Sequence, residues 1–135
     1  MKNKSIVEDC DRLIQSIACL SKCTINGCNK QAQCGHHNME RGRMYYRHML
    51  ENIVPLCIPH HTGTTLSPHG QKGNYDVHMK IYAPEWKVWK DEMKGVEITL
   101  AKMNRKRSVP GREELTKTHR FLQEFLKRGE PFDWV

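Results

Sequence analysis

The stretch that decides the fold is residues 34–61, which read CGHHNMERGRMYYRHMLENIVPLCIPHH. Short runs at 30–37 and 53–58 have the composition of β-strands, and residues 58–65 can form a short helix directly after the second run. The residues between the two runs, 38–51, form either a long hairpin tip or a short helix. The predicted local order is therefore strand, strand, helix, with cysteine and histidine side chains concentrated along it.

Helices are predicted on both sides of this region. Ser5 and Glu8 have the spacing of a capping box, which predicts that the first helix begins at residue 5. Gly95 is the predicted end of a helix that begins at Pro84, and Gly129 is the predicted end of the last helix. The predicted helices span residues 5–18, 75–82, 84–94 and 112–128. We therefore expect an α+β fold in which helices flank a small core.

The chain has 135 residues, of which 38% are hydrophobic, enough for one modest core but not for two full domains. We expect an N-terminal helix at 1–18, a Cys- and His-rich core at 19–73, and a helical C-terminal extension at 74–135. Residues 102–112 carry lysines and arginines around a Pro-Gly pair, so this part of the extension is predicted to be a basic linker.

Lysine and arginine number 22 against 15 acidic residues, a formal net charge of +7, which favours a polyanionic partner such as nucleic acid. Solubility alone is the competing explanation of this charge. No apolar run approaches the roughly 20 residues that span a bilayer, and the N-terminus lacks an apolar signal core. We therefore expect no membrane partner and a cytoplasmic location. In a reducing compartment, the six cysteines indicate metal binding rather than disulfides.

Four groups of residues carry a resemblance to a known family. They are Cys34-Gly35-His36-His37, Asn52, Pro55-Leu56-Cys57 and His60-His61. This pattern resembles the HNH endonucleases, in particular their phage-associated recombination and putative-nuclease branch. The resemblance covers roughly residues 19–70 and none of the flanks. It implies a zinc-stabilised ββα-metal core, hydrolysis of DNA phosphodiester bonds with one metal ion, and a phage or prophage protein made in a bacterial host.

The resemblance also implies roles for the first histidine pair and for the asparagine. His37 would take the proton from the attacking water, and His36 would bind the catalytic ion. Adjacent side chains of a strand point to opposite sides, so one can face the metal while the other faces the water. A neutral imidazole, with an ordinary pKa of about 6.5, suits proton abstraction at neutral pH. Asn52 would fix the hairpin and orient the base.

The second histidine pair would supply another ligand of the catalytic ion, His61. The family often has a further ligand one helical turn later, where this sequence has Thr65, a weak ligand at best. His69 is therefore the candidate third ligand, although Ser67-Pro68 disfavours a continuous helix between the two histidines. Zn²⁺, Mn²⁺ or Ni²⁺ would bind imidazole tightly and Mg²⁺ more weakly, and the sequence leaves the identity of the ion open.

A second metal site is predicted from the cysteines. A cysteine and a histidine separated by two residues have the gap of a zinc knuckle, and another cysteine pair upstream offers the other half of a tetrahedral site. The predicted ligands of this structural zinc are Cys23, Cys28, Cys57 and His60. Cys19 or Cys34 could replace one of the upstream pair. Such a site is expected because a hairpin and one short helix bury little apolar surface. Buried thiols without metal are the competing explanation.

Arg41, Arg43 and Arg47 lie in the predicted hairpin tip and could contact phosphates on either side of the scissile bond of DNA. Ordinary solvated loop charge explains each of them equally well. The basic residues of 105–112 could add sequence-independent affinity through counterion release. No base-reading motif is visible, so we expect weak or structure-based specificity, and the choice between DNA and RNA stays open.

Two other functions fit the same residues. A non-catalytic zinc module that binds nucleic acid or protein would use every cysteine and histidine structurally, but it would have no need for Asn52. An inactive nuclease relative that serves as an inhibitor or scaffold is compatible with the departure at Thr65. The oligomeric state is also open: a monomer would nick one strand, whereas a homodimer would bring two active centres to a duplex.

Overall fold

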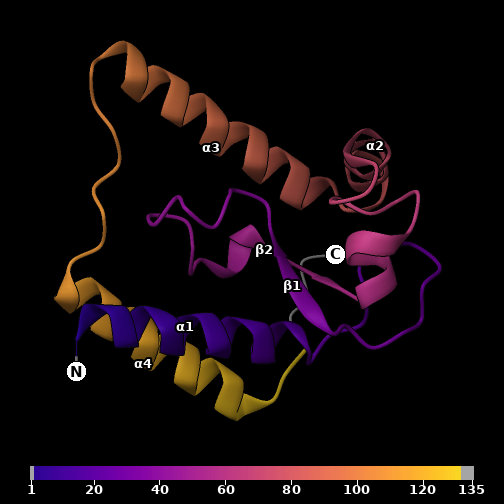
Figure 1. The fold of residues 1–135 in the computed structure, drawn as a ribbon, viewed down its shortest axis with the longest axis horizontal. Coiled ribbons are helices and arrows are strands. Elements are labelled where there is room, and N and C mark those ends of the chain that lie inside the picture. The colour runs from indigo at the N-terminus through magenta and orange to yellow at the C-terminus, as the bar shows by residue number, and fades with distance from the viewer. Residues whose placement is uncertain (1, 132–135) are drawn as a thin grey trace.

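The computed structural model describes residues 2–131, with a small antiparallel sheet at the centre and helices around it (Figure 1). In chain order the elements are α1 (Asn3–Ala18), β1 (Cys34–His37), the 3₁₀ turn η1 (Leu50–Asn52), β2 (Ile53–Leu56), the π-helical turn η2 (Pro59–Gly63), α2 (Lys72–Tyr82), α3 (Pro84–Lys102) and α4 (Arg112–Arg128). The predicted α+β class is confirmed. Within residues 2–131, no helix combines the length and the apolar character that crossing a membrane requires.

β1 and β2 pair antiparallel along their whole length. β1 is shorter than the predicted run 30–37 because residues 30–32 pair with the loop after α1 instead. The Ala32 N–H, for example, donates to the Ser21 carbonyl at 2.9 Å. The connection between the strands is a loop that ends in η1, so the long tip is observed and the alternative short helix is reduced to a single turn.

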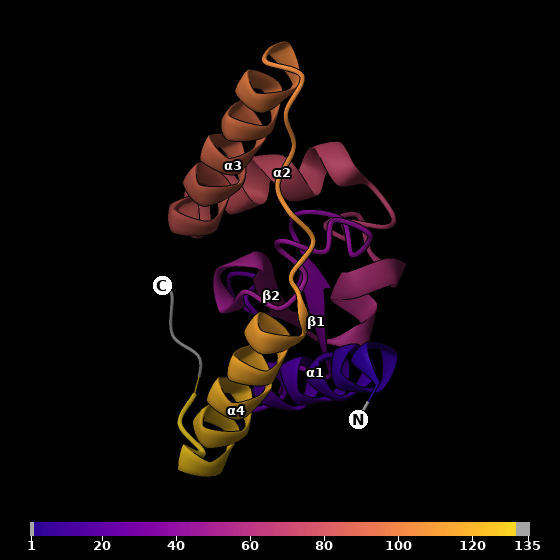
Figure 2. The same cartoon turned by 90° about the vertical axis from the view of Figure 1, so that its left-hand side faces the viewer.

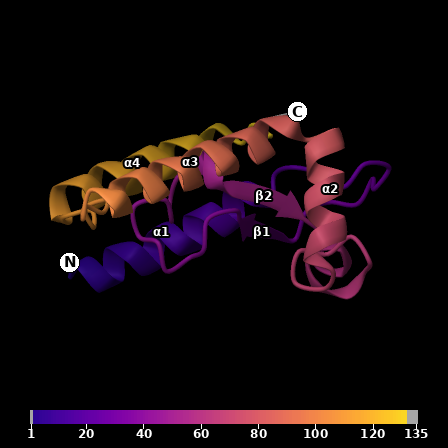
Figure 3. The same ribbon diagram turned by 90° about the horizontal axis from the view of Figure 1, so that it is seen from above.

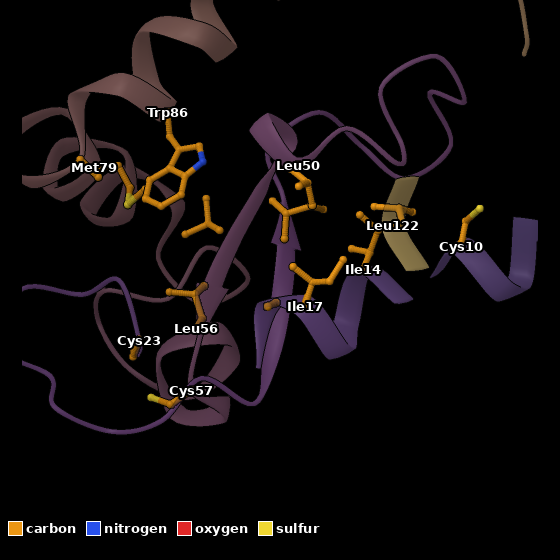
Figure 4. Close-up of a cluster of buried hydrophobic side chains, with 14 of the residues drawn as sticks. Cys10, Ile14, Ile17, Cys23, Leu50, Leu56, Cys57, Met79, Trp86 and Leu122 are labelled. Carbon is orange, nitrogen blue, oxygen red and sulfur yellow. The ribbon is translucent and has the colours of Figure 1, made fainter. Parts of the chain in front are cut away.

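The main core lies between α1, α4 and the hairpin. α1 presents apolar residues at helical spacing, and α4 runs alongside it (Figure 2). Ile14 of α1 and Leu122 of α4 are buried there, with their side chains close together (Figure 4). Gly35 allows α1 to approach the sheet, because a Cβ at this position would lie 2.6 Å from Ile53 Cγ2 and 3.1 Å from Ala18 Cβ.

The ends of α4 and α1 bear on two capping predictions. α4 has the predicted bounds, and Gly129 ends it with φ 67°, a left-handed conformation that glycine adopts without strain. The prediction that a capping box at Ser5 begins the first helix is wrong. α1 begins at Asn3, after Lys2, and no side chain caps it. Tertiary packing of its apolar face against α4 stabilises this helix, so its first turn forms without a side-chain cap.

α2 and α3 cover the other side of the hairpin, with α2 at the end of the molecule opposite the N-terminus (Figure 3). α3 is longer than predicted, because it continues through Gly95 to Lys102. A glycine costs a helix only about 1 kcal/mol, and contacts beyond it offset that cost. The Tyr46 hydroxyl donates to Glu97 Oε1 at 2.5 Å and holds α3 against the hairpin loop. The predicted basic linker follows as a non-helical connection to α4 (Figure 1).

Candidate functional site

Four metal-ligating side chains meet where β2 ends; together they are called the cysteine cluster. Its members are Cys23, Cys28, Cys57 and His60, and their ligand atoms all lie within 4.8 Å of one another. His60 Nδ1 is 3.2 Å from Cys57 Sγ and 3.6 Å from Cys23 Sγ. Three sulfurs and one imidazole nitrogen are a donor set that zinc takes in tetrahedral sites, so this cluster could hold a metal such as zinc. Cys19 and Cys34 are not part of it.

The cysteine cluster is assembled by a loop folded onto β2. Thr24 anchors that loop, because its N–H and its hydroxyl both donate to the Pro55 carbonyl, at 2.9 and 2.8 Å. Cys23 and Cys57 lie on facing segments beside Leu56 (Figure 4). Burial raises the pKa of the Cys23 thiol to about 12, so this sulfur ionises only when a cation compensates its charge. The residues present therefore fit a zinc ion.

Three histidines form a second group, the histidine cluster of His36, His61 and His69. Their nearest ring nitrogens lie within 4.8 Å of one another, and their ring centroids are 4.6 to 5.5 Å apart. Burial, reinforced by the two neighbouring histidines, lowers the pKa of His36 to about 3. Burial also lowers the pKa of His61. Neutral imidazoles close together have the ligand chemistry of a divalent-metal site.

His69 reaches this cluster through a loop and not along a continuous helix. η2 ends at Gly63, and the fully buried Ser67 then turns the chain back. The Ser67 hydroxyl donates to the Pro59 carbonyl at 2.9 Å and accepts from the Thr64 N–H at 2.8 Å. The sequence analysis treated Ser67 only as a helix breaker. The sequence Ser67-Pro68-His69 is typical of a surface loop and gives no signal that the serine is buried.

His37 lies beside the histidine cluster on β1, and its side chain is held by the hairpin loop. Its Nε2 is 3.0 Å from the Arg47 carbonyl oxygen. A carbonyl can only accept, so Nε2 carries the proton and Nδ1 keeps a free lone pair. Burial lowers the pKa of His37, an effect that the Arg47 carbonyl opposes.

Asn52 is fully buried and ties the two ends of the same loop together. Its Oδ1 accepts from the Met39 N–H at 2.5 Å, and its Nδ2 donates to the Met39 and Tyr46 carbonyls, each at 3.1 Å. All these partners are backbone groups within the loop. The Tyr46 carbonyl precedes the Arg47 carbonyl that holds His37, so Asn52 fixes the loop from which the imidazole is oriented.

Asp11 of α1 holds the loop from outside, a contact that sequence reasoning missed. Its carboxylate accepts from Arg47 Nε and Nη2 at 2.9 and 2.6 Å, from His48 Nε2 at 2.8 Å and from Arg41 Nη2 at 3.0 Å. Burial alone would raise the pKa of Asp11, but these hydrogen bonds outweigh it and hold the pKa well below its usual range. The sequence did contain one signal of this contact. Asp11 is an acidic residue that lies about one helical turn before Ile14, beside the apolar stripe of the helix.

The three arginines of the loop each have a carboxylate partner within the protein. Arg47 has a side chain only 17% exposed and is engaged by Asp11. Arg41 is 62% exposed and also reaches Asp11, while Arg43 is 48% exposed and lies 3.8 Å from Glu97 Oε2. Arg41 and Arg43 therefore remain accessible to a ligand, and Arg47 is part of the support of the loop. Contact of all three with DNA stays a prediction.

His36, His37, His61 and His69 all line one cleft of about 890 Å³. Its walls come from α1, the hairpin loop, α2 and α3. The cationic lining residues are Arg12, Arg41, Arg43, Lys72, Lys90 and Lys94, and the acidic ones are Asp11, Glu40 and Asp76. Positive side chains thus outnumber negative ones around the histidines.

Comparison of the chain with models of known protein families, with curated proteins and with solved structures finds no match.

Proposed function

We propose that this chain is a metal-dependent endonuclease of the HNH type that hydrolyses DNA phosphodiester bonds, with His37 as its general base. The observation that carries the proposal is the hydrogen bond from His37 Nε2 to the Arg47 carbonyl, beside three histidines in a cationic cleft. It supports a base in a defined tautomer next to a metal site, which is a combination that a purely structural zinc module does not need.

His37 would act through its free nitrogen. Because Nε2 is committed to a carbonyl, Nδ1 is the atom that can accept a proton from water. The water oxygen attacks phosphorus as Nδ1 takes the proton, the bond from phosphorus to O3′ breaks, and the leaving oxygen takes a proton from solvent. The products are a 5′-phosphate and a 3′-hydroxyl. Asn52 and Asp11 act as positioning residues, since they hold the loop to which His37 is bonded.

The two clusters suit different tasks. The histidine cluster offers three imidazole ligands, one of them exposed, in the lining of the cleft. A divalent ion held there would supply electrostatic stabilisation of the charge that develops on the phosphate and on the leaving oxygen. The cysteine cluster has a closed set of four ligands, two of them buried, which is typical of a structural ion.

The experiment that tests the proposal is nicking of supercoiled plasmid by the purified chain with Mg²⁺, Mn²⁺ or Zn²⁺ added separately. We expect metal-dependent nicking, and we expect His37→Ala to lower its rate at least about 100-fold, the usual contribution of a general base. His119→Ala is the matched control, because His119 lies on α4 outside the cleft, 3.8 Å from Asp9. This control should nick like the original chain.

A second candidate function is a non-catalytic zinc module. The closed cysteine cluster favours it, because that site is complete without the cleft. Such a module would bind zinc and show no nicking with any of the metals, and His37→Ala would leave its binding of nucleic acid or protein unchanged. Nicking that survives His37→Ala would contradict the assignment of the base but not the nuclease itself.

A further inference from the structure

Lys90 of α3 is a buried cation in the wall of the cleft. The residue is only 7% exposed. Among residues 2–131, the one carboxylate within ion-pair distance is that of Asp76, whose Oδ1 lies 4.0 Å from Lys90 Nζ, the limit of such a contact. A buried ammonium group without a close hydrogen-bonded partner is costly. The fold therefore keeps a positive charge at this point with little compensation from its own side chains.

The surroundings of Lys90 add positive charge. Lys72 and Lys94 line the same cleft, and both oppose the charge of Lys90. Burial together with these lysines lowers the pKa of Lys90, while Asp76 opposes the change. His36, His61 and His69 of the histidine cluster line the same cleft as Lys90. An anion bound in the cleft would add the compensation that Asp76 supplies only at the limit of ion-pair distance.

A buried donor without a protein partner also lies in the lining of the cleft. Asn38 follows His37 and lines the cleft, and its Nδ2 is buried with no acceptor among the described residues. Buried amide donors are almost always paired, so an unpaired one next to a cleft indicates an acceptor supplied by a ligand. Oxygens of a phosphate group would satisfy both the amide and the ammonium.

We propose that Lys90 and Asn38 form a phosphate subsite of the cleft, in which Lys90 Nζ binds a non-bridging oxygen of a nucleic-acid phosphate. This inference rests on the proposed function for the identity of the ligand and deepens it by naming the contacts. Lys94 of α3 and Lys72 of α2, which line the same cleft, bind the phosphates on either side. A chain of phosphates, and not a single free phosphate ion, is the ligand that engages all three lysines.

The test is binding of a fluorescent DNA duplex by the full chain carrying His37→Ala, which removes cleavage from the measurement. Lys90→Met should weaken binding about tenfold or more, the value of a hydrogen bond to a charged group. Lys90→Arg should retain binding within about threefold, since the charge is kept. Lys87→Met is the matched control on α3, because Lys87 pairs with Asp91 outside the cleft. It should bind like the parent.

Asp76→Asn separates ligand binding from a structural role. If Lys90 only pairs with Asp76, then Asp76→Asn and Lys90→Met should weaken binding equally. If Lys90 binds phosphate, Asp76→Asn should bind as tightly as the parent or more tightly. Thermal unfolding with and without duplex checks folding. Without duplex, the Tm of Lys90→Met should equal or exceed that of the parent, and the duplex should raise the Tm of Lys90→Met by less than it raises that of the parent.

Equal binding by Lys90→Met and Lys87→Met would overturn the inference, as would equal losses in Lys90→Met and Asp76→Asn. Inorganic phosphate is the second probe, and displacement of the duplex by millimolar phosphate would reassign the subsite to free phosphate. Plasmid nicking is scored separately. Duplex binding that depends on Lys90 without nicking would keep the subsite and reject the nuclease, whereas nicking without a Lys90 effect would do the reverse.

Discussion

Asp11→Asn should uncouple the N-terminal helix from the hairpin loop that holds His37. Asp11 accepts a two-pronged pair of hydrogen bonds from Arg47 and one from His48. An asparagine has the same shape but no charge, and its NH₂ group faces donors that it cannot accept from. The Arg47 carbonyl, which holds His37 Nε2, then loses its support from α1.

The expected magnitude follows from the burial of the pair. The side chains of Asp11 and Arg47 are 16% and 17% exposed, so their bonds are charge-assisted and mostly shielded from water. Removing them should lower the free energy of unfolding by about 2–3 kcal/mol, or Tm by about 10 °C for a chain of this size. The bond to Arg41, which is 62% exposed, adds little.

The effect has a defined pH dependence. The hydrogen bonds from Arg47, His48 and Arg41 outweigh burial and depress the pKa of Asp11 in the folded state. Its contribution is therefore complete above the unfolded pKa of about 3.9 and is lost as the pH falls through the folded value. The difference in unfolding free energy between the parent and Asp11→Asn should be on the order of 2–3 kcal/mol near pH 7 and should shrink below about pH 4.

The assay is urea unfolding followed by circular dichroism, together with plasmid nicking at pH 7. Asp9→Asn is the matched control on the same helix, since Asp9 pairs with the exposed Arg12 and lies outside the cleft. It should cost less than about 1 kcal/mol and leave nicking unchanged. Asp11→Asn should slow nicking at least about tenfold through misorientation of His37. Destabilisation with a full nicking rate would refute the link from Asp11 to the base.

Three further predictions concern the packing and the metal sites. Gly35→Ala should lower the free energy of unfolding in urea by about 2 kcal/mol, because its Cβ would meet a β2 side chain at 2.6 Å, whereas Gly42→Ala, with nothing within 4 Å, should be neutral; equal stability of the two variants would contradict the tight packing at Gly35. Ser67→Ala should lower the metal content from two ions per chain to one by elemental analysis, since its hydroxyl anchors the loop of the histidine cluster; two retained ions would contradict this. Cys57→Ser or excess chelator should lower Tm by more than about 10 °C and abolish nicking, and an unchanged Tm would remove the structural role of the cysteine cluster.

Much of the arrangement near the histidines could be predicted because it depends on local spacing. The hairpin and the turn after it follow from short runs of strand and breaker residues, and the structure brings each predicted ligand set together. Cysteine and histidine are few and chemically distinct, so their intervals restrict which of them can meet. Ion binding and the roles assigned by resemblance stay predictions.

The parts that sequence reasoning missed depend on contacts between distant segments. Asp11 meets Arg47 across 36 positions of the chain, and no local pattern announces such a pair. Lys90 resembles any lysine of an amphipathic helix, although it lies one turn after the buried Trp86 and so shares its inward face. The extension of α3 beyond Gly95 likewise depends on Glu97, whose partner Tyr46 comes from the hairpin loop. Propensity cannot report these contacts, because tertiary packing overrides it.

The adjacency of His60 and His61 couples the two clusters. Neighbouring side chains of a helical turn point in different directions, so one short turn can direct His60 into the cysteine cluster and His61 into the cleft. The backbone between them is one peptide unit, and the His61 N–H is bonded to the Cys57 carbonyl at 3.0 Å. A metal ion in the cysteine cluster would thereby fix the direction of His61 as well as the local fold. An ion held by the histidine cluster should be released to a chelator first, with the fold intact, and an ion held by the cysteine cluster should be released later, with loss of the fold.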